Sequence, residues 1–291
     1  MQTTFSEKTF NYLNFILLGG IAILSLYPFW YILSLSFSSA ATATQQSLHL
    51  WPKEICLASY RMVFSDPDML TGYTNTIIRT VAGTFLTMLF TCLGAYPLSK
   101  PYLPYRKCFM LFVLITMIFS GGLVPIYLLI KNLGLINNIW VYILPLLTNA
   151  FNILVVKNFF QSIPESIAES ARIDGASELR ILFQFYMPLS KPILTTVALW
   201  TAVIHWNMWF DAMIFVYDNK LQVLQTFLQR IVIQGQTSLI EKGAINYDIA
   251  QYTSETLKAA VTVVTIVPIL LVYPFLQKYF IKGIMIGSVK E

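Results

Sequence analysis

Charged residues are scarce in this sequence: they make up 11% of its 291 residues, whereas a soluble domain carries about 25%. Hydrophobic residues make up 56%, the mean hydropathy is +0.65, and the few charges collect between long apolar runs. A lipid bilayer is therefore the expected solvent for most of the chain. We expect no soluble domain within it.

Cysteine and histidine are also scarce. Cys56, Cys92 and Cys108 show no Cys-x-x-Cys spacing and no neighbouring His or Asp cluster, which favours structural thiols over a metal site or a disulfide framework. The sequence lacks a Gly-x-x-x-x-Gly-Lys-Ser/Thr phosphate loop. The net charge of +5 comes without an arginine-rich stripe. We therefore expect no metal, no cofactor bound by this chain and no nucleic-acid partner.

Six segments are long and apolar enough to cross a bilayer, which takes about 20 residues. Gly121, Gly122 and Pro125 interrupt the third, which allows it to break into a span and an interfacial helix. Lys and Arg gather in the loops on the same side as the N-terminus, which predicts that both termini are cytoplasmic. No small-residue cleavage site follows the first run, so we expect an uncleaved helix. The sequence predicts an all-α integral membrane protein with six transmembrane helices, at residues 12–38, 73–98, 108–130, 139–160, 192–216 and 257–280.

One charged segment, residues 161–191, departs from the apolar pattern. Ser162 and Glu165 predict a capping box for a first helix, and Gly175 suits a left-handed position at its C-terminal end. Ser177 is expected to cap a second helix with apolar residues at helical spacing, which two prolines then end. The plainer interpretation is a solvated connector. Two capped helices around a glycine favour a docking element instead.

The same segment resembles the EAA loop, Glu-Ala-Ala-x-x-Asp-Gly-Ala followed by Ile-x-Leu-Pro, of permease subunits of binding-protein-dependent ABC importers. Ser170 replaces the second residue of the motif, and Phe185 and Met187 replace the usual aliphatic residues. The stretches FFQSIPESIAESARIDGAS, WNMWF and GIMIGSVKE are similar to the carbohydrate branch, particularly its complex-saccharide members, and the resemblance covers nearly the whole chain. The residues that match the motif are Glu169, Ala171, Asp174, Gly175, Ala176 and Pro188.

The resemblance implies a type I ABC importer permease fold. It implies a first helix and outer loop at 1–72, a core transmembrane domain at 73–280 with a coupling loop at 161–191, and a cytoplasmic tail at 281–291. The implied function is that of a transport subunit, not an enzyme, which forms half of the path for an oligosaccharide or a polysaccharide-derived sugar. The implied setting is the bacterial cytoplasmic membrane and its lipid, with these partners: a second, homologous permease subunit, two cytoplasmic ATPase subunits that hold ATP and Mg²⁺, and an extracytoplasmic solute-binding protein.

In that family the loop forms a coupling helix that sits in a groove of the ATPase. Its charged side chains are expected to make ion pairs there, and Gly175 allows close approach of the backbone. The tail at 283–291 is expected to reach the interface of the ATPase pair. The resemblance assigns ATPase coupling to Glu169, Ala171, Arg172, Asp174, Gly175, Ala176, Arg180 and Pro188.

Polar residues inside the fifth span are costly in lipid. Trp200, Asn207 and Asp211 fall on one face of a continuous helix, which predicts contacts with sugar hydroxyls in a substrate path. The alternative is that they tie helices together. Arg79 is expected to extend toward the lipid headgroups, with an ion pair to Asp211 as the alternative. His205 is expected to be a hydrogen-bonded residue between helices and not a proton relay.

Two other functions stay open. An ABC importer permease for a non-sugar solute is disfavoured only by the resemblance to the carbohydrate branch. A stand-alone secondary transporter would call for inverted halves or an acidic relay in the spans, and the sequence shows neither. Within residues 217–256, the spacing of apolar residues predicts an amphipathic helix over the outer mouth.

Overall fold

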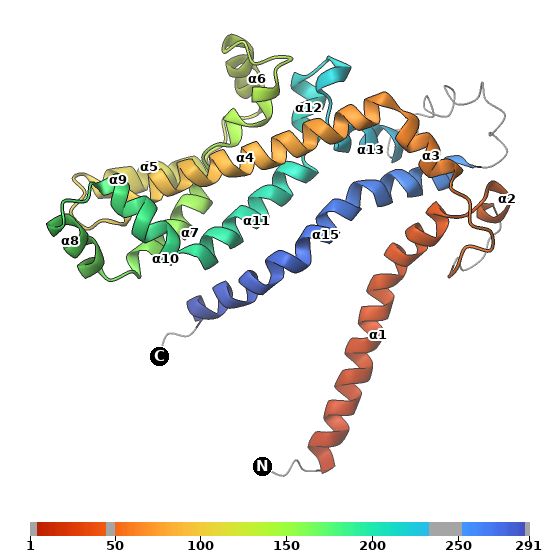
Figure 1. Ribbon diagram of the computed structural model, residues 1–291, viewed down its shortest axis with the longest axis horizontal. Helices are drawn as coiled ribbons and strands as arrows, with labels where there is room; N and C mark the ends of the chain where they lie inside the picture. Colours follow the sequence, from red (N-terminus) through yellow and green to blue (C-terminus); the bar gives the residue numbers. More distant parts are fainter. Residues whose placement is uncertain (1–4, 45–49, 233–251, 289–291) are drawn as a thin grey trace. The chain divides into compact units, whose positions relative to one another are not determined.

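The computed structural model describes residues 5–44, 50–232 and 252–288. In these residues the chain forms helices and connecting segments, with an isolated antiparallel bridge between Ser38 and Ile55 (Figure 1). The prediction of an all-α protein is confirmed. The chain divides into two compact units, Met1–Met69 with Leu228–Val267 and Leu70–Phe227 with Pro268–Glu291.

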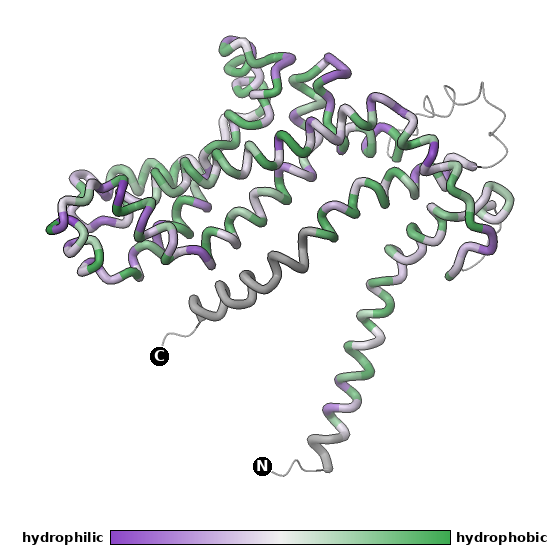
Figure 2. The backbone as a smooth tube through the Cα atoms, in the orientation of Figure 1, coloured by the Kyte–Doolittle hydropathy of each residue, from purple (hydrophilic) through white to green (hydrophobic). Residues whose placement is uncertain are grey.

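The first unit contains a long helix with an apolar surface. In α1 (Phe5–Ser36), none of the most hydropathic 18-residue window is buried, and Figure 2 shows this helix as mostly hydrophobic. Such a surface suits contact with lipid. Two short helices follow, α2 (Ala40–Ala43) and α3 (Ala58–Ser65). In the same unit, Ser59 Oγ donates to Thr256 Oγ1 at 3.0 Å, which joins α3 to the first part of α15 (Ser254–Ser288).

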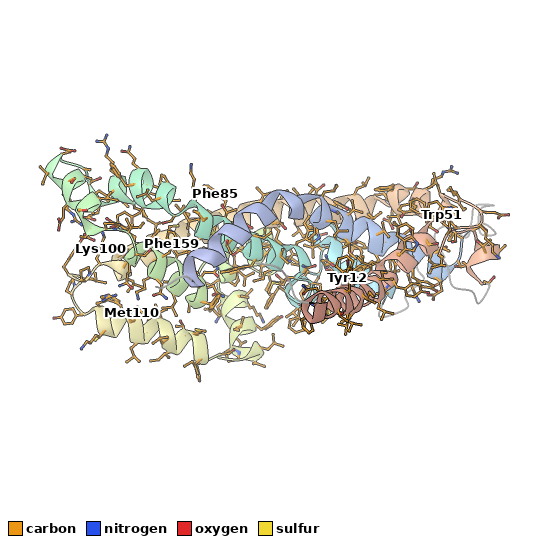
Figure 3. All side chains as sticks on the ribbon, turned by 90° about the horizontal axis from the view of Figure 1, so that it is seen from below. Tyr12, Trp51, Phe85, Lys100, Met110 and Phe159 are labelled. Carbon is orange, nitrogen blue, oxygen red and sulfur yellow. The ribbon has the colours of Figure 1, made fainter. Side chains whose placement is uncertain are left out.

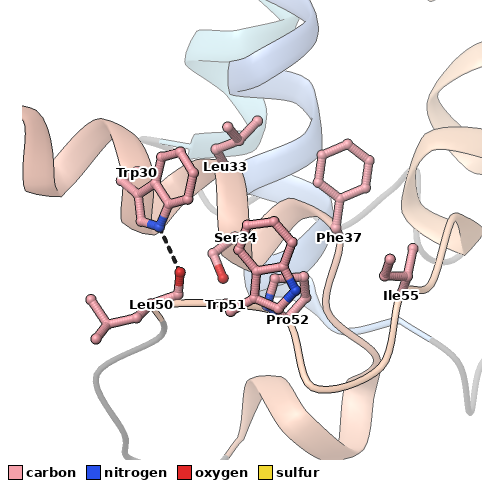
Figure 4. Close-up of a pocket in the computed structure, with 8 residues that line it drawn as sticks. All are labelled: Trp30, Leu33, Ser34, Phe37, Leu50, Trp51, Pro52 and Ile55. Carbon is pink, nitrogen blue, oxygen red and sulfur yellow. Dashed lines mark hydrogen bonds between the residues drawn. The ribbon is translucent and has the colours of Figure 1, made fainter.

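An apolar cavity of about 280 Å³ lies at the end of α1 (Figure 4). The indole N–H of Trp30 donates to the carbonyl oxygen of Leu50 at 2.6 Å, so it is not available to a ligand. Ser34 is the polar residue among the eight that line the cavity. Such a lining does not suit a ligand rich in hydroxyl groups.

The second unit is built around α4 (Pro67–Ser99). Helix α7 packs against both α5 and α11. After α4, the elements in chain order are α5 (Arg106–Ile118), α6 (Leu123–Asn132), η1 (Ile139–Tyr142), η2 (Leu144–Leu146), α7 (Ala150–Gln161), α8 (Glu165–Ile173), α9 (Glu178–Ile181), the π-helical turn η3 (Leu182–Tyr186), α10 (Met187–Leu189), α11 (Lys191–Asn207), α12 (Phe210–Phe215), η4 (Asn219–Leu221) and α13 (Leu224–Val232).

Three helices are each long and apolar enough to cross a membrane, and three bent pairs raise the number of candidate spans to six among the described residues. The predicted break in the third span is confirmed, because α5 and α6 meet at 111°. The fourth predicted span is not continuous, since η1 and η2 meet α7 at 50°, and the side chain of Asn149 starts α7 anew by accepting from the N–H of Asn152.

Three further elements differ in extent from the prediction. The fifth predicted span, 192–216, stops at Asn207, and α12 begins only at Phe210. The amphipathic helix expected within 217–256 is present as α13, and residues 233–251 lie outside the described residues. Helix α15 continues past residue 280 to Ser288.

Two buried clusters lie against α4, one near its C-terminal end and one beside its middle. One joins Tyr96 of α4 with Ala168 of α8 and Leu182 of η3, together with residues of α7 and α11. The other joins Tyr142 of η1 with Ala212 and Phe215 of α12. Two separate stretches of α4 are therefore packed, and each packed stretch lies beside one of the polar sites described below.

Candidate functional site

The segment between α7 and α11 folds as two helices around a glycine, as predicted. Ser162 closes α7, because its hydroxyl donates to the carbonyl oxygen of Phe159 at 2.7 Å. Pro164 precedes α8, and no side chain caps this helix. The predicted capping box is therefore wrong: Ser162 bonds backward into α7, and Glu165 bonds other side chains.

Gly175 ends α8 in the left-handed conformation, with φ of 79°. Its N–H donates to the carbonyl oxygen of Arg172 at 3.0 Å, and the N–H of Ala176 donates to that of Ala171 at 2.9 Å. This pair of bonds is the Schellman motif, which satisfies the last carbonyl groups of a helix. The predicted left-handed C-terminal glycine is confirmed.

The second helix begins as predicted. Ser177 Oγ accepts a hydrogen bond from the N–H of Arg180 at 3.3 Å. The helix passes through the π-helical turn into α10 and ends at Leu189, between Pro188 and Pro192, as predicted. The chain then bends by 86° into α11. Single π-helical turns occur frequently at functional sites.

Small residues bring the inner face of α8 close to the body of the unit. Ala168 and Ala171 are buried and pack in one cluster with Ile181, Leu182 and Tyr186. Ala171 was assigned to ATPase coupling by the resemblance, yet the structure places it against the core of its own chain. Its position explains the need for a small side chain, because a larger one would push α8 outward.

Four charged side chains connect α8 and α9 to the end of α4. Lys100 Nζ lies 3.0 Å from Glu165 Oε2, and a terminal nitrogen of Arg172 lies 3.3 Å from Glu165 Oε1. Arg172 Nε donates to Glu178 Oε1 at 2.7 Å. Lys100, labelled in Figure 3, lies at the same end of the unit as α8 and α9 and is 3% exposed.

Tyrosine hydroxyl groups complete these contacts. Tyr96 donates to Glu178 Oε2 at 2.6 Å, and Lys100 Nζ donates to the hydroxyl of Tyr186 at 2.6 Å. The ammonium group also lies 4.2 Å from the centre of the Tyr186 ring, a favourable cation–π distance. We call the following set the α8–α9 network: Tyr96, Lys100, Tyr102, Glu165, Arg172, Glu178 and Tyr186.

Arg172 and Glu178 each stabilise the charged form of the other. The hydrogen bond from Arg172 lowers the pKa of Glu178 below its ordinary value, and the hydrogen bond to Glu178 raises the pKa of Arg172. Arg172 also donates to the hydroxyl of Tyr102 and lies over its ring at 5.3 Å. Arg172 was expected to pair with an ATPase, but the structure shows it bonded within its own chain.

The opposite face of the segment is open. Ile173 is 86% exposed and Leu179 is 60% exposed, on either side of the Gly175 turn. Glu169 and Asp174 are exposed too, and no ion pair of theirs occurs in the described part of the chain. Arg180 is exposed and bonds a glutamine one turn further along its own helix. This face combines large apolar side chains with charge, which suits a protein partner.

The remaining motif residues lie beside this face. Ala176 is half-buried and Pro188 is exposed. Sequence reasoning identified Arg172 as a site residue but missed the other six network residues: Tyr96, Lys100, Tyr102, Glu165, Glu178 and Tyr186. Glu165 and Arg172 are seven residues apart on one helix face, a signal that was readable from the sequence. Lys100 is 65 residues from Glu165, and no local pattern connects the two.

In the first half of α4, Arg79 forms a buried ion pair with Asp211. The side chains are 0% and 12% exposed. An Arg79 terminal nitrogen also donates to the carbonyl oxygen of Met208 at 2.9 Å, and the guanidinium lies 4.8 Å from the centre of the Tyr142 ring. The expectation that Arg79 extends toward headgroups is wrong, because burial and these contacts hold it inward. The alternative pairing with Asp211 is confirmed.

The break after Asn207 changes the predicted substrate face. Met208 is extended, with ψ of 128°, so Asn207 and Asp211 do not lie on one continuous helix, and that prediction is wrong. Asn207 is exposed and donates to the carbonyl oxygen of Val203 at 2.9 Å. The break involves no glycine or proline. It is held instead by Arg79, which binds both Met208 and Asp211.

Two other polar residues of α11 are engaged within the chain. The indole N–H of Trp200 donates to Asn152 Oδ1 at 2.8 Å, which ties α11 to α7. His205 is 1% exposed, and a Cβ added at Gly83 would lie 2.6 Å from its ring. No hydrogen bond to His205 Nδ1 occurs among the described residues. The glycine lets α4 approach this ring closely.

A cavity of about 370 Å³ lies beside the α8–α9 network. Tyr96, Lys100 and Glu178 line it together with Tyr102 and Leu179, which belong to the loop after α4 and to α9. The network therefore closes one side of an open space, and apolar packing does not fill that side.

Residues 69–286 match the family model described as the binding-protein-dependent transport system inner membrane component. The chain belongs to this family. The permease is therefore a membrane transport subunit and not a catalytic enzyme. It is 40% identical to Protein LplC of Bacillus subtilis over 293 residues, which cover 100% of the permease and 98% of that relative.

Two further comparisons agree. The permease is 38% identical to the polygalacturonan/rhamnogalacturonan transport system permease protein YtcP of Bacillus subtilis, over 98% of the permease and 99% of the relative. It is also similar to a chain in the crystal structure of a bacterial ABC transporter involved in the import of the acidic polysaccharide alginate. That match has a TM-score of 0.89 and 37% identity, and it covers 96% of the permease and 99% of that chain. The predicted ABC importer permease fold is confirmed.

Proposed function

We propose that the permease is one of two membrane subunits of an ATP-driven importer and forms half of the path for an oligosaccharide or a polysaccharide-derived sugar. The sugar is supported by the relatives, one named for polygalacturonan and rhamnogalacturonan and one involved in alginate import. Both match the permease over nearly its full length. Relatives named for melibiose, raffinose and stachyose, and for galactooligosaccharides, extend the same class.

The proposal includes partners that the chain does not supply. The family name itself supports an external solute-binding protein. The sequence lacks a phosphate loop, so two cytoplasmic ATPase subunits would bind ATP and Mg²⁺, and a second, homologous permease subunit would complete the path. The distribution of Lys and Arg supports cytoplasmic termini in a bacterial inner membrane, with α8 and α9 on the cytoplasmic side.

The observation that carries the coupling role is the open face around Gly175. Ile173 and Leu179 are large apolar side chains that water surrounds in the isolated chain. Burying them in a groove of the ATPase would be favourable, because it would remove apolar surface from water. The charges of Glu169, Asp174 and Arg180 at the rim would select the partner. The left-handed turn at Gly175 leaves no side chain between the two helices, so the partner can approach the backbone there.

A substrate path beside the break after Asn207 is part of the proposal. Broken transmembrane helices in transporters commonly line the substrate site, because the unwound backbone can bond a ligand. Asn207 is exposed next to the break, and the side chain of Asp211 is held by Arg79. Asn207 would therefore contact the sugar directly, while Asp211 would shape the path. Trp200, bonded to Asn152, would support α11 from behind.

The docking role is tested by Ile173→Glu in a complex reconstituted with the partner permease, the ATPase subunits and the binding protein. Ile173 is so exposed that the substitution should leave the fold of this chain unchanged. We expect ATPase subunits to co-purify at a stoichiometry reduced about tenfold or more, because a charge enters an apolar contact.

The matched control is Lys107→Glu, an exposed residue in the first turn of α5 that also gains a negative charge. It should bind the ATPases normally. Equal retention of the ATPases by Ile173→Glu and the unmodified permease would rule out this face as the docking surface. The substrate class is tested by uptake assays in vesicles that contain the reconstituted complex, with acidic oligosaccharides, neutral oligosaccharides and a non-sugar solute. The proposal expects uptake of an oligosaccharide and none of the non-sugar solute.

A further inference from the structure

The charged residues of α8 and α9 divide into two groups with different surroundings. Glu169, Asp174 and Arg180 face outward. Glu165 and Arg172, by contrast, bond Lys100 and Glu178 within the chain. The second group is therefore not free to bind a partner. Its contacts lead to the end of α4, a helix that runs to the other end of the unit.

Glu178 is the residue through which three elements meet. One of its carboxylate oxygens accepts from Arg172 of α8 at 2.7 Å, and the other accepts from Tyr96 of α4 at 2.6 Å. Glu178 itself is the first residue of α9. A single carboxylate thus joins both helices of the segment to α4.

Lys100 makes a second, parallel connection. It binds Glu165 at the start of α8 and the hydroxyl of Tyr186 in the π-helical turn. Lys100 is 3% exposed, and a buried ammonium group needs such partners. The helices on both sides of the Gly175 turn are therefore bonded to Tyr96 of α4 or to Lys100, which directly follows α4. Bending at Gly175 alone cannot separate the segment from α4.

Apolar packing also connects the segment to α4, because Tyr96 lies in one buried cluster with Ala168 and Leu182, but it leaves a cavity beside the network. The cavity of about 370 Å³ lies between the loop after α4 and the start of α9, and Tyr96 and Glu178 line it. Without the hydrogen bonds of the network, the segment would have room to move relative to α4. Ala168 and Ala171 would still hold it to the core, so it would stay folded and available to a partner.

We propose that Tyr96, Arg172 and Glu178 are positioning residues that fasten the helix–glycine–helix segment to α4, so that a displacement of the docked segment is transmitted to α4. This inference rests on the proposed function. It separates two tasks within one loop: the outer face binds the ATPase, and the network carries the movement into the membrane. The resemblance to the family assigned Arg172 to the first task, and the structure assigns it to the second.

Tyr96→Phe is the sharpest test, because it removes one hydroxyl group and keeps the ring in its packed site. In the reconstituted complex we expect unchanged co-purification of the ATPase subunits and a three- to tenfold lower yield of solute transported per ATP hydrolysed, a change of about the size that network residues produce in coupling. Tyr105→Phe is the matched control, since Tyr105 is 81% exposed in the loop after α4, and it should behave as the unmodified permease.

A double-mutant cycle adds a readout that a general loss of stability would not move. Glu178→Gln should also lower transport per ATP, and the Tyr96→Phe/Glu178→Gln pair should lower it no further than the stronger single variant, because both act on one bond. Additive losses, an unchanged transport yield in Tyr96→Phe, or a parallel loss of ATPase binding would each overturn the proposal. If the unmodified permease does not bind ATPase subunits, the proposed function fails and this inference fails with it.

Discussion

Two ion pairs, one in the first half of α4 and one beside its C-terminal end, differ in their exposure to water. The Arg79–Asp211 pair has side-chain exposures of 0% and 12%, and its guanidinium also stacks on a tyrosine and bonds a main-chain carbonyl. The Arg172–Glu178 pair has exposures of 31% and 52%. The two pairs are well separated: Arg79 and Tyr96, which bonds Glu178, are about 25 Å apart along the axis of α4, at about 1.5 Å per residue.

This difference shows how one type of interaction serves two tasks. A buried ion pair is strongly destabilising to break, because the charge left behind has no water. A half-exposed pair contributes little to stability, typically below about 1 kcal/mol, because water screens it. The first can fix a break in a helix permanently. The second can be removed without unfolding the chain, so its effect on coupling can be measured separately.

Removing Arg79 should produce the largest effect. Arg79→Met leaves Asp211 buried without its partner, and we expect a loss of about 3–5 kcal/mol in the free energy of unfolding. Thermal unfolding in detergent measures it. Asp211→Asn should cost less than Arg79→Met, and the double variant Arg79→Met/Asp211→Leu should recover much of the loss. A normal melting temperature for Arg79→Met alone would show that the pair does not hold the break.

Asn207 tests whether the break between α11 and α12 contacts the sugar, separately from its contribution to stability. Asn207→Leu removes an exposed amide that bonds only its own helix among the contacts described, so stability and ATPase binding should change little. Sugar uptake should fall about tenfold, since a site that bonds a hydroxyl group loses that order of affinity or more with the bond. Asn219→Leu, at another exposed asparagine, is the control. Normal uptake by Asn207→Leu would place the sugar elsewhere.

Changes of pH near neutrality should produce the smallest effect. The folded-state pKa of Glu178 lies below its ordinary value of 4.5, so the stabilisation from its charge is fully present above that value and is lost only as the pH falls through the lower, folded-state pKa. Arg172 stays charged throughout, because its pKa is raised. Transport per ATP should thus be flat between roughly pH 6 and pH 8. A titration in that range which disappears in Glu178→Gln would contradict this assignment.

The local features of the helix–glycine–helix segment could be predicted, because short-range rules govern them. The left-handed Gly175 and the Ser177 cap each depend on bonds to residues within five positions along the chain. The capping box failed for a local reason as well: Ser162 can close one helix or open the next, and a pattern of residue types does not decide between them.

The features that could not be predicted depend on residues far apart in the sequence. The break after Asn207 contains no glycine or proline, and Arg79 stabilises it from 129 residues away. Lys100 bonds Glu165 across 65 residues, and Tyr96 bonds Glu178 across 82 residues. For the same reason, the two roles of the charged residues in 161–191 could not be separated: exposure distinguishes Glu169 from Arg172, and both are simply charged in the sequence.

The π-helical turn at Leu182–Tyr186 sets the direction in which Glu178 points relative to Tyr186. It holds one residue more than an α-helical turn would, and it lies between Glu178, which bonds Tyr96, and Tyr186, which bonds Lys100. Deleting one residue here would leave a regular helix but would rotate Glu178 by about 100° relative to Tyr186. The two could then no longer reach the end of α4 together. The number of residues in this stretch is therefore fixed, and a one-residue insertion or deletion within it should disrupt the α8–α9 network.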